Sequence, residues 1–556
     1  MLEGFEPWPP EAAARYRAEG LWEGRTIARM VADSAADRPE KVAVVDGERR
    51  LGYAELVTRV DRLACRLRRE GLREQDRVVM QLPNSLEFVV AYLALTRLGA
   101  IPVMALRAHR EAEIAHFVRS AGAVAYMIPD VLQRYDHRLL AQAVAAQCPT
   151  LAMTFVLGEP LAGQRALRPL IDEPLDAAVV ASELADVRPD PADVATMLLS
   201  GGTTSMSKLI PRTHDDYVLN ARECARVAGF DANTVLMAVL PLGHNYNLAS
   251  PGMLGAFYAG GSVVIAPSMD AESVFPLVER ERVTVISAAV PLVTAWLASP
   301  VPERCDLSPL KVMQNGGARL APELRRRIRE RFGCTPQEVY GTAEGLINMT
   351  RLDDPEELLL ESSGAPVCDA DEIKVLGDDG RELPDGEPGE LVARGPYTIR
   401  GYYRVPEKNR EAFTADGYYR MGDIVRKRGR HVWAEGRRND LINRGGEKIS
   451  CEEVENLIFR HPAVHQVALV AMPDPVFGEK ACAFVVAKPG TSLGFDELIG
   501  FLKQQRIASF KLPERLELID AMPTSLVGKV LKRQLRETIA ARLALEQPAP
   551  LPPAAS

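Results

Sequence analysis

Short apolar strands alternate with helical segments from residue 78 to about residue 300, and this rhythm most constrains the fold. Residues 78–82 form an apolar run, and Ser85 stands where it can cap a helix over residues 86–98. The rhythm is repeated further along, with strands expected at 101–105, 283–289 and 312–314 and a helix at 322–332. Strands that are apolar throughout and separated by helices predict an α/β fold of mostly parallel sheets flanked by helices.

The chain is longer and more varied than one domain requires, because 556 residues exceed what a single hydrophobic core usually supports. After about Asp371 the pattern changes to short strands between Gly, Pro and Asp turns, which predicts a β-rich subdomain. From about residue 440 the pattern is that of a small α+β unit. We expect a large domain over residues 1–438, a small, mobile C-terminal domain over 439–545 and a disordered tail over 546–556.

The overall composition argues against several classes of function. The net charge of −8 argues against a nucleic-acid partner, because bulk electrostatics would repel the phosphate backbone. The eight cysteines are scattered without a C-x-x-C pair, so neither a zinc site nor a disulfide framework is expected. The first 24 residues lack the apolar stretch of a signal peptide, and no apolar run reaches the length of a membrane span. A cytoplasmic location without membrane contact is expected.

Four segments stand out in the sequence, and they occur in this order: residues 200–208, 339–345, 418–423 and 435–449. The first three carry residues suited to nucleotide chemistry, and the fourth lies where the composition changes and could be the interdomain linker. The first is rich in Gly, Ser and Thr and ends in Lys208, which suits a phosphate-binding loop, although its spacing is not that of a Walker A motif. In the second, Glu344 could hold a magnesium ion that bridges phosphates. In the third, Asp423 could accept hydrogen bonds from ribose hydroxyls.

Each segment alone also has a simpler interpretation. A run of Gly, Ser and Thr is more often a flexible surface loop, and Glu344 alone reads as a solvated acid at a strand end. Asp423 alone belongs to an ordinary β-turn, and Lys529 near the C-terminus reads as a solvated charge. The joint occurrence of these segments in one order favours a nucleotide-using enzyme over the simpler readings.

With these segments in this order, the sequence resembles the adenylate-forming superfamily of acyl-CoA synthetases, peptide-synthetase adenylation domains and luciferases. The resemblance covers about residues 23–543. It is greatest to aryl-acid ligases of siderophore pathways, such as 2,3-dihydroxybenzoate- and salicylate-AMP ligases, through residues 211–214, 244–246, 395–403 and 443–448. The resemblance implies that ATP and Mg²⁺ activate a small aromatic, ortho-hydroxylated carboxylic acid as its acyl-adenylate, which is then transferred to a carrier-protein thiol.

The resemblance also assigns roles around the nucleotide. Glu344 would hold magnesium, Lys529 would reach both the substrate carboxylate and the α-phosphate, and His244 would complete the catalytic group. The other ATP-binding positions that it implies are Thr203, Thr204 and Lys208 in the phosphate loop, Gly316, Gly317, Ala318 and Tyr340 around the adenine with Gly341 and Thr342 beside them, and Asp423 and Arg437 at the ribose.

Members of the superfamily work in two conformations, and the resemblance implies that the C-terminal domain of this chain also adopts both. After adenylation the small domain would rotate, withdrawing Lys529 and bringing Gly445 and Gly446 to the active site, where the missing side chains let a pantetheine arm pass. The hinge would fall at Asn439, where relatives usually carry Asp or Lys.

For the aryl acid, the subgroup pattern implies a pocket lined by His244, Asn245 and Tyr246, with Asn245 facing the ortho hydroxyl. The other interpretation is that these residues merely turn the chain after a strand. Ser250 matches a position that is small and polar in dihydroxybenzoate enzymes. Ile347 matches a wall position that is Val in dihydroxybenzoate enzymes and Leu in salicylate enzymes, so the ring substituents stay open.

The sequence departs from the family pattern at two places. The phosphate loop carries Ser205, Met206 and Ser207 where Gly and Pro are usual, which could change its flexibility and its affinity for ATP. Asn315 stands where siderophore ligases commonly have Val. If Asn315 faces the pocket it needs a polar partner, which would indicate an amino- or aza-substituted hydroxybenzoate; the alternative is a bond to the backbone.

The sequence leaves two candidate thiols as the acceptor of the acyl group. No Gly-Gly-(His/Asp)-Ser-(Leu/Ile) attachment site occurs in the chain, so the expected partner is a separate aryl carrier protein with a phosphopantetheine arm. Free coenzyme A is the alternative acceptor. A third interpretation, motivated by the altered phosphate loop, is a catalytically weak adenylate-binding protein. A homodimer is left open.

Overall fold

The computed structural model describes residues 1–200, 207–437, 441–444, 447–505, 507, 509–525 and 530–546. The chain divides into two compact units. Unit 1 comprises Met1–Ile373 and Val392–Arg420, and unit 2 comprises Lys374–Leu391 and Met421–Ser556. The sequence-based boundary at residue 438 and the mobility of the small domain stay predictions.

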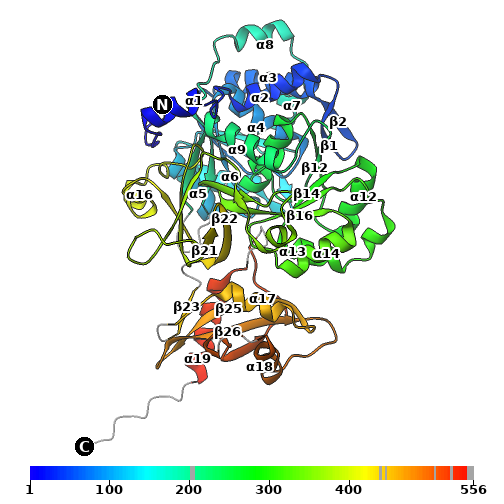
Figure 1. Ribbon diagram of the computed structural model, residues 1–556. Coiled ribbons are helices and arrows are strands. Elements are labelled where there is room, and N and C mark those ends of the chain that lie inside the picture. The colour runs from blue at the N-terminus through cyan, green and yellow to red at the C-terminus, as the bar shows by residue number, and fades with distance from the viewer. Residues whose placement is uncertain are drawn as a thin grey trace, which may run out of the picture. The chain divides into compact units, whose positions relative to one another are not determined.

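A nine-stranded sheet forms one half of unit 1 (Figure 1). Its strands pair in parallel from β1 to β16, and antiparallel pairing occurs only at its two ends, among the described residues. In spatial order the strands are β18 (Ala365–Pro366), β17 (Gly345–Met349), β16 (Thr335–Thr342), β15 (Val312–Gly316), β14 (Val285–Ala288), β12 (Val235–Ala238), β13 (Ser262–Ile265), β1 (Val42–Asp46) and β2 (Arg49–Gly52).

A seven-stranded sheet forms the other half of unit 1, and it is parallel except where β11 pairs with β10. Its order is β11 (Leu209–Thr213), β10 (Val194–Leu199), β4 (Ile101–Met104), β3 (Arg77–Met80), β5 (Ala125–Pro129), β8 (Met153–Leu157) and β9 (Arg165–Ala166). A separate hairpin joins β6 (Val131–Leu132) to β7 (Tyr135–Asp136).

Helices pack on both sheets of unit 1. Helix α14 packs on the nine-stranded sheet, and α4, α5 and α6 pack on the seven-stranded sheet (Figure 1). Helix α11 also packs on the nine-stranded sheet. The helices of unit 1 are α1 (Pro10–Ala18), α2 (Ile27–Asp37), α3 (Tyr53–Arg69), α4 (Leu86–Leu98), α5 (Glu111–Ala121), α6 (His137–Gln147), α7 (Leu167–Asp172), α8 (Ala177–Glu183), α9 (His214–Val227), α10 (Asn245–Ala249), α11 (Gly252–Tyr258), α12 (Ala271–Glu281), α13 (Val290–Ala298), the 3₁₀ helix η1 (Val301–Arg304), α14 (Pro322–Phe332), α15 (Glu356–Glu361) and α16 (Pro406–Ala412).

Helix α4 shows how local chemistry sets these boundaries. The Ser85 hydroxyl accepts a hydrogen bond from the Phe88 amide at 3.1 Å, which satisfies one of the free N–H groups of the first turn. Gly99 ends the helix in the left-handed region, with φ of 76°. The helix spans Leu86–Leu98, so the sequence-based prediction for this segment is confirmed.

A four-stranded sheet is built from residues 372–437. It comprises β19 (Glu372–Leu376), β20 (Gly389–Arg394), β21 (Tyr419–Arg428) and β22 (His431–Arg437) in that order. These strands are the β-rich segment that the composition change after Asp371 predicts.

The C-terminal sheet of unit 2 buries both of its faces. Helices α17 (Cys451–Phe459) and α18 (Phe495–Gln504) share one apolar cluster with it, and α19 (Lys532–Glu546) shares the other. The sheet contains β24 (Glu447–Ile449), β23 (Ile442–Arg444), β26 (Gly478–Ala487), β25 (Val464–Asp474) and β27 (Arg515–Leu518), and η3 (Ser509–Lys511) precedes β27. The alternation of Leu469 and Val470 between the two clusters is the period-two pattern of a strand with two covered faces.

The predicted fold class is confirmed: unit 1 is a large α/β body of mostly parallel sheets, and unit 2 is smaller and α+β. Glu546, the first residue of the expected tail, is the last residue of α19, and residues 547–556 lie outside the described residues. Among the residues that are described, no helix is long and apolar enough to cross a membrane.

Candidate active site

The ends of the expected phosphate loop are held together at the edge of the seven-stranded sheet. The Ser200 amide donates to the Lys208 carbonyl at 2.9 Å, and the Lys208 amide donates to the Ser200 hydroxyl at 2.9 Å. Both residues directly adjoin the β10–β11 pair. Thr203 and Thr204 lie outside the described residues, so their phosphate-binding role stays a prediction.

Lys208 and Glu344, which are 136 positions apart, meet at one aromatic side chain. The Lys208 ammonium nitrogen lies 4.6 Å from the centroid of the Tyr402 ring. The Tyr402 hydroxyl donates to Glu344 Oε1 at 2.8 Å and lies 3.2 Å from the Tyr419 hydroxyl. Glu344 is only 6% exposed, so its carboxylate is held in a largely dry environment. Tyr402 therefore contacts a cation with its ring and a carboxylate with its hydroxyl.

Arg212 fixes the turn that carries Glu344. Its fully buried guanidinium donates to the Ala343 carbonyl at 2.9 Å, to the Tyr397 carbonyl at 3.1 Å and to Asp216 at 2.8 Å. Burial raises the pKa of Asp216 to about 6, while the Arg212 charge acts to lower it. Because this ion pair is fully buried, removal of either partner would leave an uncompensated charge.

The turn after Glu344 depends on a glycine. Gly345 has φ of 146°, and a Cβ built there would lie 2.4 Å from Thr398 Cα. Any side chain at this position would therefore be strained and would displace the segment that contains Tyr402. The Thr342 hydroxyl donates to the Gly345 carbonyl at 3.3 Å, which closes the same turn.

The residues expected around the adenine lie at the carboxyl ends of neighbouring strands. Gly316 ends β15, Gly317 and Ala318 are exposed just beyond it, and Tyr340, Gly341 and Thr342 end β16. Gly317 has φ of 86°, and a Cβ there would meet no atom within 4 Å. Carboxyl ends of parallel strands are where α/β folds usually bind ligands.

The expected aryl pocket is built on neutral hydrogen bonds. The Tyr217 hydroxyl donates to Asn245 Oδ1 at 2.8 Å, and Asn245 Nδ2 donates to the Ser250 hydroxyl at 3.2 Å. Asn220 Nδ2 also donates to Ser250, at 3.2 Å. All four side chains are buried. Asn245 and Ser250, which were assigned to the pocket separately, are therefore direct neighbours.

His244 begins helix α10 as its N-cap, and its Nδ1 accepts a hydrogen bond from the Tyr246 amide at 3.3 Å. Burial lowers the pKa of His244 to about 4, so the imidazole is neutral near pH 7. Tyr246 packs against Gly316, where an added Cβ would lie 2.9 Å from its ring. Tyr246 and Ile347 belong to the same buried apolar cluster.

The sequence left two alternatives for the Asn315 side chain, a substrate contact or a bond to the backbone, and the structure contains the backbone bond. Its Nδ2 donates to the Ala318 carbonyl at 2.7 Å and to Glu338 Oε2 at 3.2 Å. Glu338 in turn pairs with Arg325 at 2.9 Å. A substrate contact of Asn315 remains a prediction, and the observed bonds tie the amide to the loop after β15.

The remaining assigned residues lie in unit 2. Asp423 is buried on β21, and it is the register partner of Arg437 on β22. The side chain of Arg437, together with Asn439, Gly445, Gly446 and Lys529, lies outside the described residues. Their roles at the ribose, the hinge, the thiol passage and the α-phosphate stay predictions.

Two known family profiles match most of the chain. A profile of the AMP-binding enzyme family matches residues 31–403, and one of the AMP-binding enzyme C-terminal domain matches residues 453–529.

The chain belongs to the AMP-binding enzyme family. The resemblance inferred from the ordered segments is therefore confirmed.

Relatives of this AMP-binding enzyme match over nearly the whole chain. It is 46% identical to a 2,3-dihydroxybenzoate-AMP ligase of Bacillus subtilis (98% of this chain and 99% of that one). It is also 46% identical to a salicylyl-CoA synthase / salicylate adenylyltransferase of a Streptomyces species (97% and 98%). A solved structure of MbtA from Mycobacterium smegmatis, without ligand, superposes with a TM-score of 0.74 at 37% identity, over 96% of this chain and 98% of that one.

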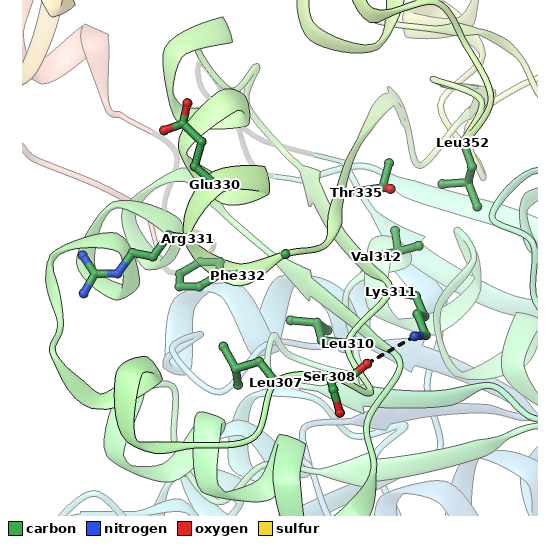
Figure 2. Close-up of a pocket in the computed structure, with 11 residues that line it drawn as sticks. Leu307, Ser308, Leu310, Lys311, Val312, Glu330, Arg331, Phe332, Thr335 and Leu352 are labelled. Atoms are coloured by element: carbon green, nitrogen blue, oxygen red, sulfur yellow. Dashed lines mark hydrogen bonds between the residues drawn. The ribbon is translucent and has the colours of Figure 1, made fainter.

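Figure 2 shows residues that line a surface hollow of about 650 Å³ in this AMP-binding enzyme, and none of the assigned residues is among them. Its lining includes Val312 and Thr335, which begin β15 and β16, and Lys311, whose ammonium donates to the Ser308 carbonyl at 3.2 Å. Gly316 and Thr342 end the same two strands. The hollow is therefore at the amino ends of the strands, opposite the candidate active site.

Three residues of the AMP-binding enzyme's candidate site were given no role from the sequence: Arg212, Tyr217 and Tyr402. Tyr402 and Arg212 stood in stretches that resembled the aryl-acid subgroup, but neither was given a role. Tyr217 lay in no motif. The only signal for Tyr402 and Arg212 was their place in those stretches, and the contact partner of Tyr217 is set by the packing of α9 against α10.

Proposed function

We propose that this enzyme uses ATP to convert a small ortho-hydroxylated aromatic acid into its acyl-adenylate. It then transfers the acyl group to the phosphopantetheine thiol of a separate carrier protein, with release of AMP. The observation that carries the proposal is the pairing of two features in unit 1. Lys208 and Glu344 are fixed around Tyr402, and the buried Asn245–Ser250 pair matches the subgroup's aryl position. Full-length likeness to a 2,3-dihydroxybenzoate-AMP ligase supports the same reaction.

In the first half-reaction a carboxylate oxygen of the aryl acid attacks the α-phosphorus. A bond forms between that oxygen and phosphorus, and the bond to the bridging oxygen of the β-phosphate breaks, releasing pyrophosphate. The approach of one anion to another is opposed by charge repulsion. Cations held in place beforehand, such as Lys208, lower that cost because they do not have to reorganise during the reaction.

The residues present fit a magnesium ion. Magnesium in nucleotide sites is commonly held by one or two carboxylates together with phosphate oxygens. Glu344 offers such a carboxylate, whose Oε1 accepts a hydrogen bond from the Tyr402 hydroxyl. When bound, the ion would neutralise charge on the phosphates. Tyr402 orients the carboxylate, and Arg212 fixes the backbone of the preceding residue.

Asn245 is the residue that would select an ortho-hydroxylated ring. Its amide is held by Tyr217 on one side and Ser250 on the other, so its orientation is fixed before substrate arrives. If the second N–H of the Asn245 amide pairs with a substrate hydroxyl, analogues that lack the hydroxyl are disfavoured, because that N–H is then left unpaired. The neutral His244 adds no charge beside the ring.

Lys529, Asn439, Gly445 and Gly446 complete the proposal on the strength of the resemblance. Lys529 would supply the second cation at the α-phosphorus, Asn439 would be the hinge, and the two glycines would line the passage for the pantetheine arm. Asp423 and Arg437, paired across β21 and β22, would hold the ribose.

Pyrophosphate exchange over a panel of acids tests the first half-reaction. The panel comprises benzoate, salicylate, 2,3-dihydroxybenzoate, aminobenzoates and hydroxypicolinate. We expect exchange that depends on an ortho-hydroxylated acid, and a fall of about two to three orders of magnitude in Lys529→Ala, as for loss of one electrostatic group at the reacting centre. Exchange that is independent of the ring substituents, or unaltered in Lys529→Ala, would contradict the proposal.

Coenzyme A is the second candidate acceptor, because one relative is named a salicylyl-CoA synthase / salicylate adenylyltransferase. Thioester formation measured with a loaded carrier domain and with coenzyme A, at equal thiol concentration, separates the two. A kcat/KM that is higher with the carrier supports the proposal, and one that is higher with coenzyme A replaces it.

A further inference from the structure

The N-terminal arm, residues 1–24, is anchored in unit 1 by aromatic side chains. Trp8, Tyr16 and Trp22 are at most 6% exposed, and they belong to the same buried apolar cluster as Tyr397 and Tyr403. The rings of Trp8 and Trp22 meet edge to face, with their centroids 5.3 Å apart. The AMP-binding profile begins only at residue 31, so the family match assigns no role to the arm.

Two indole groups of the arm bond the backbone of residues 395–404. Trp8 Nε1 donates to the Gly395 carbonyl at 3.2 Å, and Trp22 Nε1 donates to the Pro396 carbonyl at 3.0 Å. An indole has one polar atom, and both of these buried tryptophans use it on this segment. A buried N–H group is costly to leave unpaired, so the two bonds hold the segment to the arm.

The segment depends on such tertiary bonds for its position. It lies between β20 and α16 and forms neither a helix nor a strand. At its far end the Arg404 amide donates to the Gly4 carbonyl at 3.2 Å, so the arm bonds both ends of the segment. Tyr402 lies between these attachments.

The same segment bonds the turn that carries Glu344. The Ile399 amide donates to the Glu344 carbonyl at 2.8 Å, and the Tyr402 hydroxyl donates to Glu344 Oε1 at 2.8 Å. Arg212 joins the two pieces of chain as well, because it donates to the Tyr397 carbonyl and to the carbonyl that precedes Glu344. The backbone and the carboxylate of Glu344 are therefore both attached to residues 395–404.

We propose that Trp8 and Trp22 are positioning residues for the magnesium ligand Glu344. They fix the start of the segment, the segment fixes Tyr402, and Tyr402 orients the carboxylate before the ion binds. Groups that orient a metal ligand in advance raise the affinity for the metal, because the ligand then loses less freedom on binding. The inference rests on the proposed magnesium role of Glu344.

Trp8→Phe and Trp22→Phe test the two bonds, because each keeps an aromatic ring and removes only the N–H donor and part of the ring system. The probe is an ATP analogue that cannot be cleaved between its α- and β-phosphates, titrated by calorimetry with magnesium and, separately, with EDTA. We expect the Kd with magnesium to rise roughly three- to tenfold in Trp22→Phe, as for loss of one hydrogen bond. The Kd with EDTA should stay within about twofold of wild type.

The rise should be smaller in Trp8→Phe than in Trp22→Phe. The Gly395 carbonyl also accepts from the Thr398 amide at 3.3 Å, so it keeps one bond when the Trp8 indole is lost. Hydrogen exchange of the backbone amides of residues 395–404 gives a readout that needs no ligand. Exchange in this segment should be faster in both variants than in the wild type.

Trp296→Phe is the matched control. Trp296 is 1% exposed, and its indole donates to a backbone carbonyl, that of Met269, at 2.9 Å. The substitution therefore removes the same kind of bond from the same unit, but at α13 instead of the segment. It should lower the stability of the protein without changing the Kd with magnesium or the hydrogen exchange of residues 395–404.

Glu344→Gln, titrated in the same way, separates this inference from the proposed function. An unchanged Kd with magnesium in Glu344→Gln would overturn the magnesium role of Glu344, and the inference with it. A raised Kd in Glu344→Gln but unchanged values in Trp8→Phe and Trp22→Phe would overturn only the positioning role. Equal rises in Trp22→Phe and Trp296→Phe, or with magnesium and EDTA, would also overturn it, because they would indicate a general loss of stability.

Discussion

The two ends of the unit 1 site are built from opposite kinds of interaction. The end expected at the phosphates uses full charges: Lys208, Glu344 and the buried Arg212–Asp216 pair. The end expected at the ring uses neutral amides and hydroxyls, which contact one another. A charge acts on a polyanion over several ångströms, whereas a neutral hydrogen bond acts only in contact and depends on geometry. The charged end is therefore suited to accelerating the reaction, and the neutral end is suited to selecting the aryl acid.

This difference predicts how each end responds to substitution. Loss of a charge at the phosphate end should lower the rate for every aryl acid alike. Loss of a hydrogen bond at the ring end should alter the ranking of acids and leave the rate with the poorest acid nearly unchanged. A substitution that does the opposite would break the comparison.

The largest effect is expected for Glu344→Gln, which removes the charge and keeps the shape. We expect aryl-acid-dependent pyrophosphate exchange to fall by roughly 100- to 1,000-fold, as for loss of one preorganised electrostatic group. The fall should be the same for salicylate and for 2,3-dihydroxybenzoate. Exchange rates with both acids, over a range of magnesium concentrations, measure it. A fall confined to one acid would assign Glu344 to the ring end instead.

A smaller effect is expected for Asn245→Leu at the ring end. The preference for salicylate over benzoate, as a ratio of kcat/KM, should fall roughly 10- to 100-fold, the equivalent of one unpaired buried amide. The benzoate value itself should change little. Ser250→Ala removes the acceptor of Asn245 Nδ2 but keeps the amide, so its ratio should lie between those of Asn245→Leu and the wild type. A ratio unaltered in Asn245→Leu would remove the residue from the pocket.

The sequence predicted some of this organisation and missed the rest for a physical reason. The local signals of Ser85 and Gly99 act within one helix, so the bounds of α4 were predictable. The ordered segments placed Glu344 and Lys208 in one site only through the resemblance. Their shared contact with Tyr402 depends on how three distant segments pack, and no spacing in the sequence encodes it.

Asn315 illustrates the same limit of sequence-based prediction. The sequence identified the polar side chain at an apolar position but left its direction open. The choice is made by neighbours on other elements, since Glu338 on β16 and the Ala318 carbonyl both accept from its amide. Such a choice needs the register of β15 against β16, which only the folded sheet supplies.

A third effect, smaller still, is expected for Tyr402→Phe. The ring that faces Lys208 is retained, while the hydroxyl that orients Glu344 is lost. We expect exchange to fall roughly tenfold, in line with a hydrogen bond to a charged group, and equally for all acids. Tyr402→Leu also removes the ring, so it should fall further, and the difference between the two variants measures the cation–π contact. Equal rates in both variants would show that the ring face does not matter.

The smallest effect concerns the neutrality of the ring end and appears in stability rather than rate. The pKa of His244 is about 4 when folded and about 6.5 in an unfolded chain. Because the folded value is lower, the unfolded chain takes up a proton first as the pH falls. The contribution of His244 to stability is therefore complete above about pH 6.5 and is lost progressively between pH 6.5 and 4.

His244→Asn isolates this contribution, because asparagine also caps helices and does not titrate. Between pH 7.5 and 5.5 the free energy of unfolding of the wild type should fall by about 1 kcal/mol more than that of the variant. Denaturant unfolding of both proteins at the two pH values measures the difference. Parallel pH curves would mean that His244 titrates normally in the folded protein. The ring end would then become cationic in mild acid, and the contrast between a charged end and a neutral end would hold only at neutral pH and above.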